Sequence, residues 1–148
     1  MMRRHFTPDG DAVLLAAPFE VGVVVGATLP WPRSYCGHVD ELLSMARRFG
    51  ATCVLLDVRL GGQRSRAIEW APLLAALPLT PAVIALGWRA SELEAHEARQ
   101  WGCADYVDLS AATWAADLAD AVATALAVRR RDLAEGRTTL GQARARVH

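Results

Sequence analysis

The chain has 148 residues, of which 53% are hydrophobic, and its 16 arginines balance 16 acidic side chains, so the formal net charge is zero. This length and composition suit one domain with one ordinary core, and the neutral charge excludes a whole-chain attraction to nucleic acid, membranes or acidic partners. The chain contains no lysine, which excludes a catalytic lysine of any kind.

The amino-terminal third predicts two strands, a loop and one helix. Residues 11–18 and 20–27 are short apolar runs, the second rich in valine, and almost nothing separates them. Residues 28–37 hold two prolines and a glycine, which predicts a loop. Residues 38–50 have apolar side chains at helical spacing and end at a glycine, which predicts a helix.

The middle of the chain predicts a buried strand with a charge near its end. The run 51–60 is continuously apolar up to Asp57, and a polar turn that starts with two glycines follows it. Residues 67–77 have helical spacing, and Pro72 must lie in the first turn of this helix or kink it. Residues 80–88 predict another strand that is apolar on both faces.

The last part of the chain continues the alternation of helices and strands. Residues 91–102 predict a helix with Ser91 as its N-cap and Glu94 three residues later, which is the capping-box pattern. Residues 104–109 predict a short strand. Residues 110–131 predict a long, alanine-rich helix with its own cap.

Strands that are apolar on both faces and alternate with helices indicate a parallel sheet covered on both sides. We therefore predict a doubly wound, flavodoxin-like α/β domain with a five-stranded, mostly parallel sheet and helices on both faces. Binding and reaction sites in such sheets lie at the carboxyl ends of the strands. Asp57, Gly87 and Asp108 fall at or near such ends.

Two regions are expected along the chain: a domain over residues 1–128 and a basic segment over residues 129–148. The second region holds six arginines and few large apolar side chains, which predicts a helical extension or a disordered tail. A solvated end is the plain interpretation of this tail. Contact with an acidic partner or with nucleic acid is the alternative.

Metal, cofactor and membrane signatures are missing from the sequence. Cys36, Cys53 and Cys103 have no CxxC spacing and the four histidines are scattered, so we expect neither disulfides nor a metal site. No apolar run approaches the roughly 20 residues of a membrane span, and we find no signal peptide. Gly61–Gly62 alone is not a cofactor fingerprint, and no Ser–His–Asp or Cys–His arrangement is evident. We therefore expect a cytoplasmic protein that is not an enzyme and binds no cofactor.

Three runs in the chain, VLLDVRL, TPAVIALG and GCADYVDLS, resemble the receiver domain of bacterial response regulators in their order and spacing. The resemblance extends over roughly residues 38–128. In that family an aspartate that accepts a phosphoryl group ends the third strand, a threonine or serine ends the fourth, and a lysine–proline pair ends the fifth. The resemblance implies that Asp57 occupies the phosphoacceptor position, and that the chain binds protein partners in two-component signalling.

The chain departs from the family at the positions that support the chemistry. Gly87 stands where the hydroxyl residue belongs, Leu109 where the lysine belongs, and Ser110 where the proline belongs. The acidic pair that ends the first strand in the family is missing too. The two candidate strands end in Ala16–Ala17–Pro18 and Gly26–Ala27 instead.

Phosphoryl transfer to a carboxylate needs a divalent cation and donors aimed at the equatorial oxygens. Magnesium prefers several oxygen ligands, and Asp57 would have to hold it nearly alone. We therefore expect a pseudo-receiver, in which Asp57 is a relic carboxylate that is solvated, caps the next turn, or pairs with Arg59, Arg64 or Arg66. An active receiver in which an arginine replaces the lysine is the alternative, since arginine binds phosphate well.

The expected degenerate pocket comprises Gly87, Leu109, Arg59 and Trp88. We expect Trp88 either to fill the pocket or to be an ordinary aromatic at its rim. The resemblance also implies an output face on the fourth helix, the fifth strand and the fifth helix. On this face we expect a homodimer or protein partner to contact Tyr106, Trp101, Trp114 and Leu118.

The amino-terminal half fits the receiver pattern less well. A receiver has two helices before its third strand, but this sequence predicts one, so either the first helix is lost or the first two strands pair as a hairpin. Paired strands before a helix are also typical of the STAS domain of anti-sigma-factor antagonists, which is a third interpretation. Ser65 is the only hydroxyl near the position of that family's Asp–Ser signature.

Overall fold

The computed structural model describes residues 10–61 and 66–136, and within them the chain forms a five-stranded parallel sheet with the strand order β2-β1-β3-β4-β5. The strands are β1 (Val13–Ala16), β2 (Arg33–Cys36), β3 (Cys53–Asp57), β4 (Ala82–Gly87) and β5 (Asp105–Asp108). The helices are α1 (Phe19–Gly26), α2 (Leu42–Phe49), α3 (Ala71–Ala75), α4 (Glu92–Gln100) and α5 (Trp114–Ala134), with short 3₁₀ turns at Val39–Glu41 and Ala67–Trp70.

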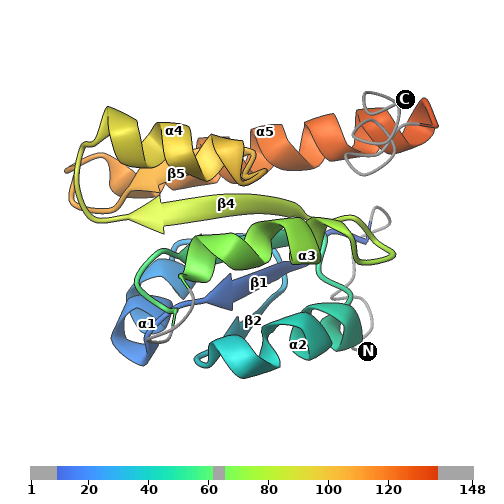
Figure 1. Ribbon diagram of the computed structural model, residues 1–148, viewed down its shortest axis with the longest axis horizontal. Coiled ribbons are helices and arrows are strands. Elements are labelled where there is room, and N and C mark those ends of the chain that lie inside the picture. Colours follow the sequence, from blue (N-terminus) through green and yellow to red (C-terminus); the bar gives the residue numbers. More distant parts are fainter. Residues whose placement is uncertain (1–9, 62–65, 137–148) are drawn as a thin grey trace.

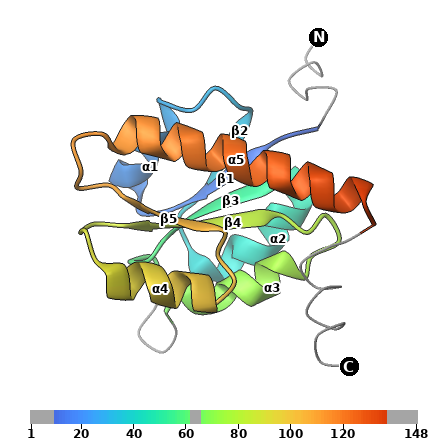
Figure 2. The same cartoon turned by 90° about the horizontal axis from the view of Figure 1, so that it is seen from above.

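The elements form three layers, as Figures 1 and 2 show. Helices α1 and α5 cover one face of the sheet, and α2, α3 and α4 cover the other. Every neighbouring pair of strands is parallel, so the prediction of a doubly wound α/β domain is confirmed. The central strands are buried on both faces, which explains why their sequences are continuously apolar.

The second predicted strand, at residues 20–27, is wrong, because this run forms helix α1. Valine is β-branched and favours strands, and the run shows no helical alternation because apolar side chains lie on both sides of the helix. Val21 and Val25 are buried against the sheet, whereas Val23 and Val24 are exposed. The fold overrides the local preference here, and Pro18 is the residue at which the helix begins.

The loop predicted at residues 28–37 is also wrong in its second half, where Arg33–Cys36 forms β2. This strand lies at the edge of the sheet and pairs with β1 in parallel. Its four residues follow two prolines and begin with the polar pair Arg33 and Ser34, so the run gives only a weak strand signal. No helix is lost before β3, and the antiparallel pair that would favour a STAS domain is not formed.

The predicted N-cap of α4 is present, because the Ser91 hydroxyl accepts a hydrogen bond from the Glu94 backbone N–H at 3.1 Å. The Ser91→Ala variant is expected to lose about 1 kcal/mol of unfolding free energy, since this N–H would have no partner in the helix. Urea unfolding followed by tryptophan fluorescence measures the loss. The Ser91→Asp variant keeps an acceptor at this position, so it should unfold within a few tenths of a kcal/mol of the parent. A Ser91→Asp variant as unstable as Ser91→Ala would contradict the assignment.

Helix α5 begins four residues later than the predicted 110–131 and ends three residues later, at Ala134. Its N-cap residue, Thr113, makes no side-chain hydrogen bond to the helix backbone, so the predicted side-chain cap is wrong. The last turns are attached to the rest of the domain, because Arg129 donates hydrogen bonds to the carbonyls of Leu79 and Thr80 at 2.6–3.2 Å. Residues 137–148 of the basic segment lie outside the described residues.

The three cysteines are free thiols, and all three are buried in the core. Among the described residues, no helix combines the length and the apolar character that crossing a bilayer requires.

Candidate functional site

The candidate site lies at the carboxyl edge of the sheet, around the last residue of β3. This residue is Asp57, and it is fully buried. The strand places it here because the apolar run that precedes it forms the centre of the sheet, and the chain turns directly after it. Trp88 reaches the same place from the loop after β4, since parallel neighbouring strands end at the same edge.

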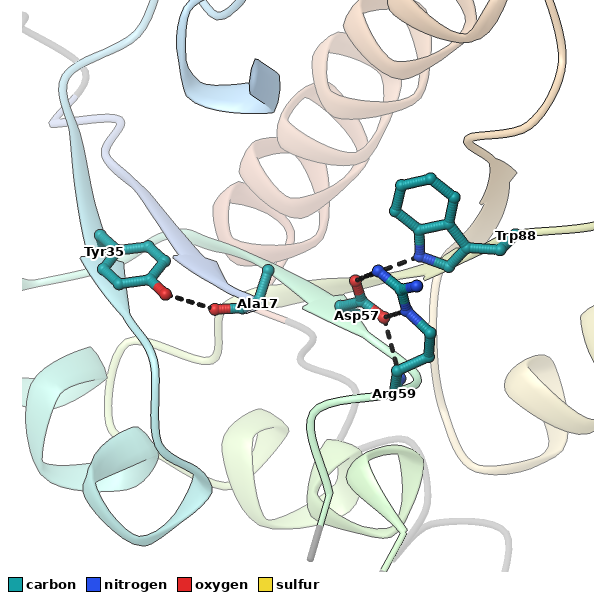
Figure 3. Close-up of polar contacts among 5 residues, drawn as sticks. All are labelled: Ala17, Tyr35, Asp57, Arg59 and Trp88. Carbon is teal, nitrogen blue, oxygen red and sulfur yellow. Dashed lines mark hydrogen bonds and ion pairs between the residues drawn. The ribbon is translucent and has the colours of Figure 1, made fainter. Parts of the chain in front are cut away.

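Both carboxylate oxygens of Asp57 are hydrogen-bonded (Figure 3). Oδ1 accepts the Arg59 backbone N–H at 2.8 Å and the Arg59 Nε–H at 3.4 Å. Oδ2 accepts the Trp88 indole N–H at 3.2 Å and the Arg59 guanidinium at 3.4 Å. The guanidinium also lies over the Trp88 ring, 4.1 Å from its centroid, in a cation–π contact. Asp57, Arg59 and Trp88 therefore form one closed cluster.

The sequence analysis gave three alternatives for Asp57: solvated, capping the next turn, or paired with an arginine. The first is not observed, and the other two are. The carboxylate is not solvated, because Arg59 and Trp88, which are themselves partly exposed, lie against it. It does cap the following turn, and it does pair with an arginine, Arg59. Arg66 pairs with Glu97 instead, at 2.6 Å. Gly62, Arg64 and Ser65 lie outside the described residues.

The end of β1 provides no carboxylate beside Asp57. The chain there reads Ala16, Ala17, and the Ala17 carbonyl accepts a hydrogen bond from the Tyr35 hydroxyl at 2.7 Å (Figure 3). No group of three histidine, cysteine or acidic side chains that could hold a metal ion occurs within the described residues. The magnesium ion that phosphoryl transfer requires in receivers would thus have one carboxylate, already hydrogen-bonded on both oxygens, and these residues do not fit it.

Gly87 and Tyr106 lie against each other next to this cluster. The tyrosine ring fits there only because residue 87 has no side chain. A Cβ atom at Gly87 would lie 1.8 Å from the Tyr106 hydroxyl oxygen and 2.3 Å from its Cζ atom. The Tyr106 hydroxyl donates a short hydrogen bond to the Glu94 carboxylate and lies 3.0 Å from the Arg89 carbonyl oxygen. Burial, followed by the Glu94 carboxylate, raises the pKa of Tyr106, so the phenol stays protonated.

The side chains at the end of β5 offer no cation. Leu109, at the position of the family's lysine, is buried in the core between the sheet and α5. The Asp108 carboxylate caps its own turn, because it accepts the backbone N–H of Ser110 at 2.9 Å and the hydroxyl of Ser110 at 2.6 Å. Within the described residues, Arg59 is therefore the cation that contacts Asp57.

The four residues expected on the output face differ in their exposure. Tyr106 and Trp101 are half-buried beside α4, and Trp114 is half-buried at the start of α5. Leu118 is fully buried in the core, because α5 turns this position toward the sheet, so it cannot contact a partner. A surface groove of about 520 Å³ runs between α4, β5 and the start of α5. Its charged lining residues are acidic: Glu92, Asp105, Asp108 and Asp117.

Two features of the site were missed by the sequence analysis. The sequence analysis noted Glu94 only as part of a capping box. In the structure its carboxylate contacts Tyr106 and Arg89 instead. The closure of the Gly87 position by Tyr106 had no sequence signal, since it depends on the direction of one side chain between two neighbouring strands.

Comparisons with solved structures show the fold of receiver domains. The signal receiver domain of a LuxO-type repressor protein from Vibrio parahaemolyticus superposes with a TM-score of 0.71 at 18% identity, covering 86% of this chain and 98% of that one. A CheY-like receiver domain protein from Methanospirillum hungatei gives a TM-score of 0.68 at 14% identity, covering 82% and 97%. A response regulator from Burkholderia pseudomallei with a phosphorylated aspartic acid and a calcium ion gives 0.59 at 18% identity, covering 85% and 72%. No protein-family model and no curated protein sequence matches the chain.

Proposed function

We propose that this chain is a cytoplasmic receiver-type module of bacterial two-component signalling that acts by protein–protein contact, as a homodimer, without phosphorylation of Asp57. The observation that carries the proposal is the closed cluster of Asp57, Arg59 and Trp88. The receiver fold supports the signalling context, and the replaced pocket residues support independence from phosphorylation.

The closed cluster opposes phosphorylation for a physical reason. An incoming phosphoryl group would need an oxygen of Asp57 that now accepts hydrogen bonds from Arg59 or Trp88. Its negative charge would need a metal ion, and the described residues contain no group of three acidic, histidine or cysteine side chains that could hold one. Breaking the cluster removes the acceptor of the Arg59 backbone N–H and of the Trp88 indole N–H, which costs about 0.5–1.5 kcal/mol for each hydrogen bond, since both residues are partly exposed.

The contact of Tyr106 with Gly87 supports a module that stays in one conformation. Tyr106 matches the aromatic residue that reports activation in the receiver family. Its hydroxyl is held by Glu94, and its ring fills the space beside Gly87. A ligand shifts a conformational equilibrium only through differential affinity for its two states. Gly87 has no side chain that could contact a phosphoryl group. At this position a phosphoryl group would therefore bind neither conformational state more tightly than the other.

The acidic groove between α4, β5 and α5 is the surface on which we place the protein partner. Glu92, Asp108 and Asp117 line it, and Ala95 forms part of its apolar floor. A partner segment with arginine or lysine side chains would match this charge, and complementary charge mainly sets specificity and the rate of association. The half-buried Trp101 and Trp114 lie on the elements that flank this surface.

An active phosphoacceptor is the second candidate, because the Arg59 guanidinium lies within 3.4 Å of Asp57, where a cation would meet a phosphoryl oxygen. The two candidates differ in their response to beryllofluoride with magnesium, which mimics an aspartyl phosphate. We expect no saturable change in tryptophan fluorescence and no Asp57-dependent mass shift with acetyl phosphate. A conventional receiver is the positive control.

A saturable response that disappears in both Asp57→Asn and Trp88→Phe variants would overturn phosphorylation independence. The Trp88→Phe variant is informative because Trp88 contacts Asp57 directly, so it identifies which of the five tryptophans reports occupancy.

A further inference from the structure

Helix α1 exposes more apolar surface than a helix on a domain surface normally does. Phe19, Val23 and Val24 are 68%, 56% and 57% exposed, while Val21 and Val25 on the opposite side are buried in the core. A helix that is apolar all round is usually buried, and a contiguous exposed apolar patch usually marks a contact surface. The outer face of α1 is therefore apolar but exposed.

The exposed side chains form a row that fits a copy of itself. Phe19, Val23 and Ala27 lie four residues apart, so they form one ridge that runs from a large side chain to a small one. When two such helices pack antiparallel about a two-fold axis, the Phe19 end of one copy lies beside the Ala27 end of the other. Val23 then lies at the two-fold axis. A parallel pair would place phenylalanine against phenylalanine.

The large end of the ridge is held in place before any partner arrives. The Phe19 ring meets the Tyr35 ring edge to face, with centroids 6.1 Å apart. Tyr35 is fixed in turn, because its ring fills the space beside Gly22, where a Cβ atom would lie 2.5 Å away, and its hydroxyl bonds to the Ala17 carbonyl. A rigid aromatic anchor loses little conformational entropy on binding.

The charges beside α1 favour the same antiparallel arrangement. Glu20 is exposed at the start of the helix. Arg33 is exposed near its end, where the guanidinium donates to the Leu29 carbonyl at 3.3 Å and lies beside Gly26. Within the part of the chain that the structure describes, neither residue has an ion-pair partner. Antiparallel pairing brings the Glu20 of one copy toward the Arg33 of the other, at both ends of the contact.

We propose that the exposed face of α1 is the homodimer interface, with two copies packed antiparallel around Val23. The inference rests on the homodimer of the proposed function and moves its surface away from the α4–β5–α5 face, where the sequence had placed it. Helix α1 packs beside β1 and β2 at one edge of the sheet, whereas β5 forms the other edge. Each dimer thus keeps two acidic grooves open for partners.

Sedimentation equilibrium of the full chain tests the proposal. A contact between two short helices is at the small end of specific interfaces, so we expect a monomer–dimer equilibrium with a dissociation constant on the order of micromolar. The Val23→Asp variant should raise this constant at least about tenfold, because it places a charge at the centre of the interface. The Leu93→Asp variant is the matched control, since Leu93 is 78% exposed on α4 and should leave dimerisation unchanged.

Charge exchange tests the orientation. The Glu20→Arg and Arg33→Glu variants should each weaken the dimer, and the double variant should recover most of the loss. Circular dichroism confirms that each variant is folded. A chain that stays monomeric at every concentration overturns the homodimer. A dimer that Val23→Asp leaves unchanged overturns only the α1 surface. Neither result bears on the response to beryllofluoride, so failure of the interface and failure of phosphorylation independence are separable.

Discussion

Substituting alanine for Gly87 is expected to lower the free energy of unfolding by about 2 kcal/mol, although it adds a single methyl group. The new Cβ atom would lie 1.8 Å from the Tyr106 hydroxyl oxygen, which is far inside van der Waals contact. Tyr106 would have to move and would break its hydrogen bond to Glu94. The backbone of Gly87 does not require glycine, since its φ is not in the left-handed region, so the cost arises from the contact with Tyr106.

A double-mutant cycle isolates this contact. In a Tyr106→Ala background, Gly87→Ala should be neutral or slightly stabilising, because the clash is gone and alanine restricts the unfolded chain more than glycine does. In a Tyr106→Phe background the cost should persist, since the ring atoms Cζ and Cε1 remain within 2.5 Å of the new Cβ. Urea unfolding of the six proteins gives the coupling free energy. Additive effects of Gly87→Ala and Tyr106→Ala would show that the two residues do not constrain each other.

Replacing Asp57 with alanine is expected to destabilise the protein by about 2–3 kcal/mol. The carboxylate is fully buried and accepts the Arg59 backbone N–H and the Trp88 indole N–H, which would both lose their partner. The charge of Arg59 contributes less than its contacts suggest, because the half-exposed guanidinium regains water. In a receiver with several clustered carboxylates, removing one relieves repulsion, so the two kinds of pocket predict opposite signs.

The matched control for this prediction is Asp57→Asn, which keeps an oxygen acceptor at the same place and should lose less than the alanine variant. Thermal and urea unfolding measure both variants against the parent. An increase in stability on replacing Asp57 with alanine would mean that the residue is held against electrostatic repulsion, and the closed cluster would not describe the pocket in solution.

The sequence was most informative where local signals and the fold agree. The buried strands β3 and β4 were recognisable because both of their faces are covered, and α4 because Ser91 caps it. Helix α1 was mistaken for a strand because its outer face is as apolar as its inner one, so no helical period marks Val23 or Val24. The edge strand β2 was missed because it is only four residues long, two prolines precede it, and its first two residues, Arg33 and Ser34, are polar.

The sequence predicted where the candidate site lies in the fold, but not how all of its side chains are arranged. The order of the strands brings Asp57 and Trp88 to one edge of the sheet, and Arg59 lies only two residues from Asp57, so their proximity follows from the chain path. The closure of the Gly87 position follows from the rotamer of Tyr106, which no periodicity encodes. Burial of Leu118, in contrast, follows from the sequence, because Leu118, Ala121, Val122 and Ala125 have the spacing of one helix face, and this face is buried in the core.

The pairing of Gly87 with Tyr106 also constrains the order in which this pocket can change by single substitutions. A threonine or serine at position 87 would place a hydroxyl where conventional receivers carry one, but its Cβ atom would overlap the hydroxyl and ring of Tyr106. A hydroxyl residue at position 87 fits only after Tyr106 has been replaced, and replacing Tyr106 alone removes its hydrogen bond to Glu94. Each first step is disfavoured while the other residue is unchanged. A hydroxyl side chain at position 87 is therefore compatible with this fold only together with a second substitution at Tyr106.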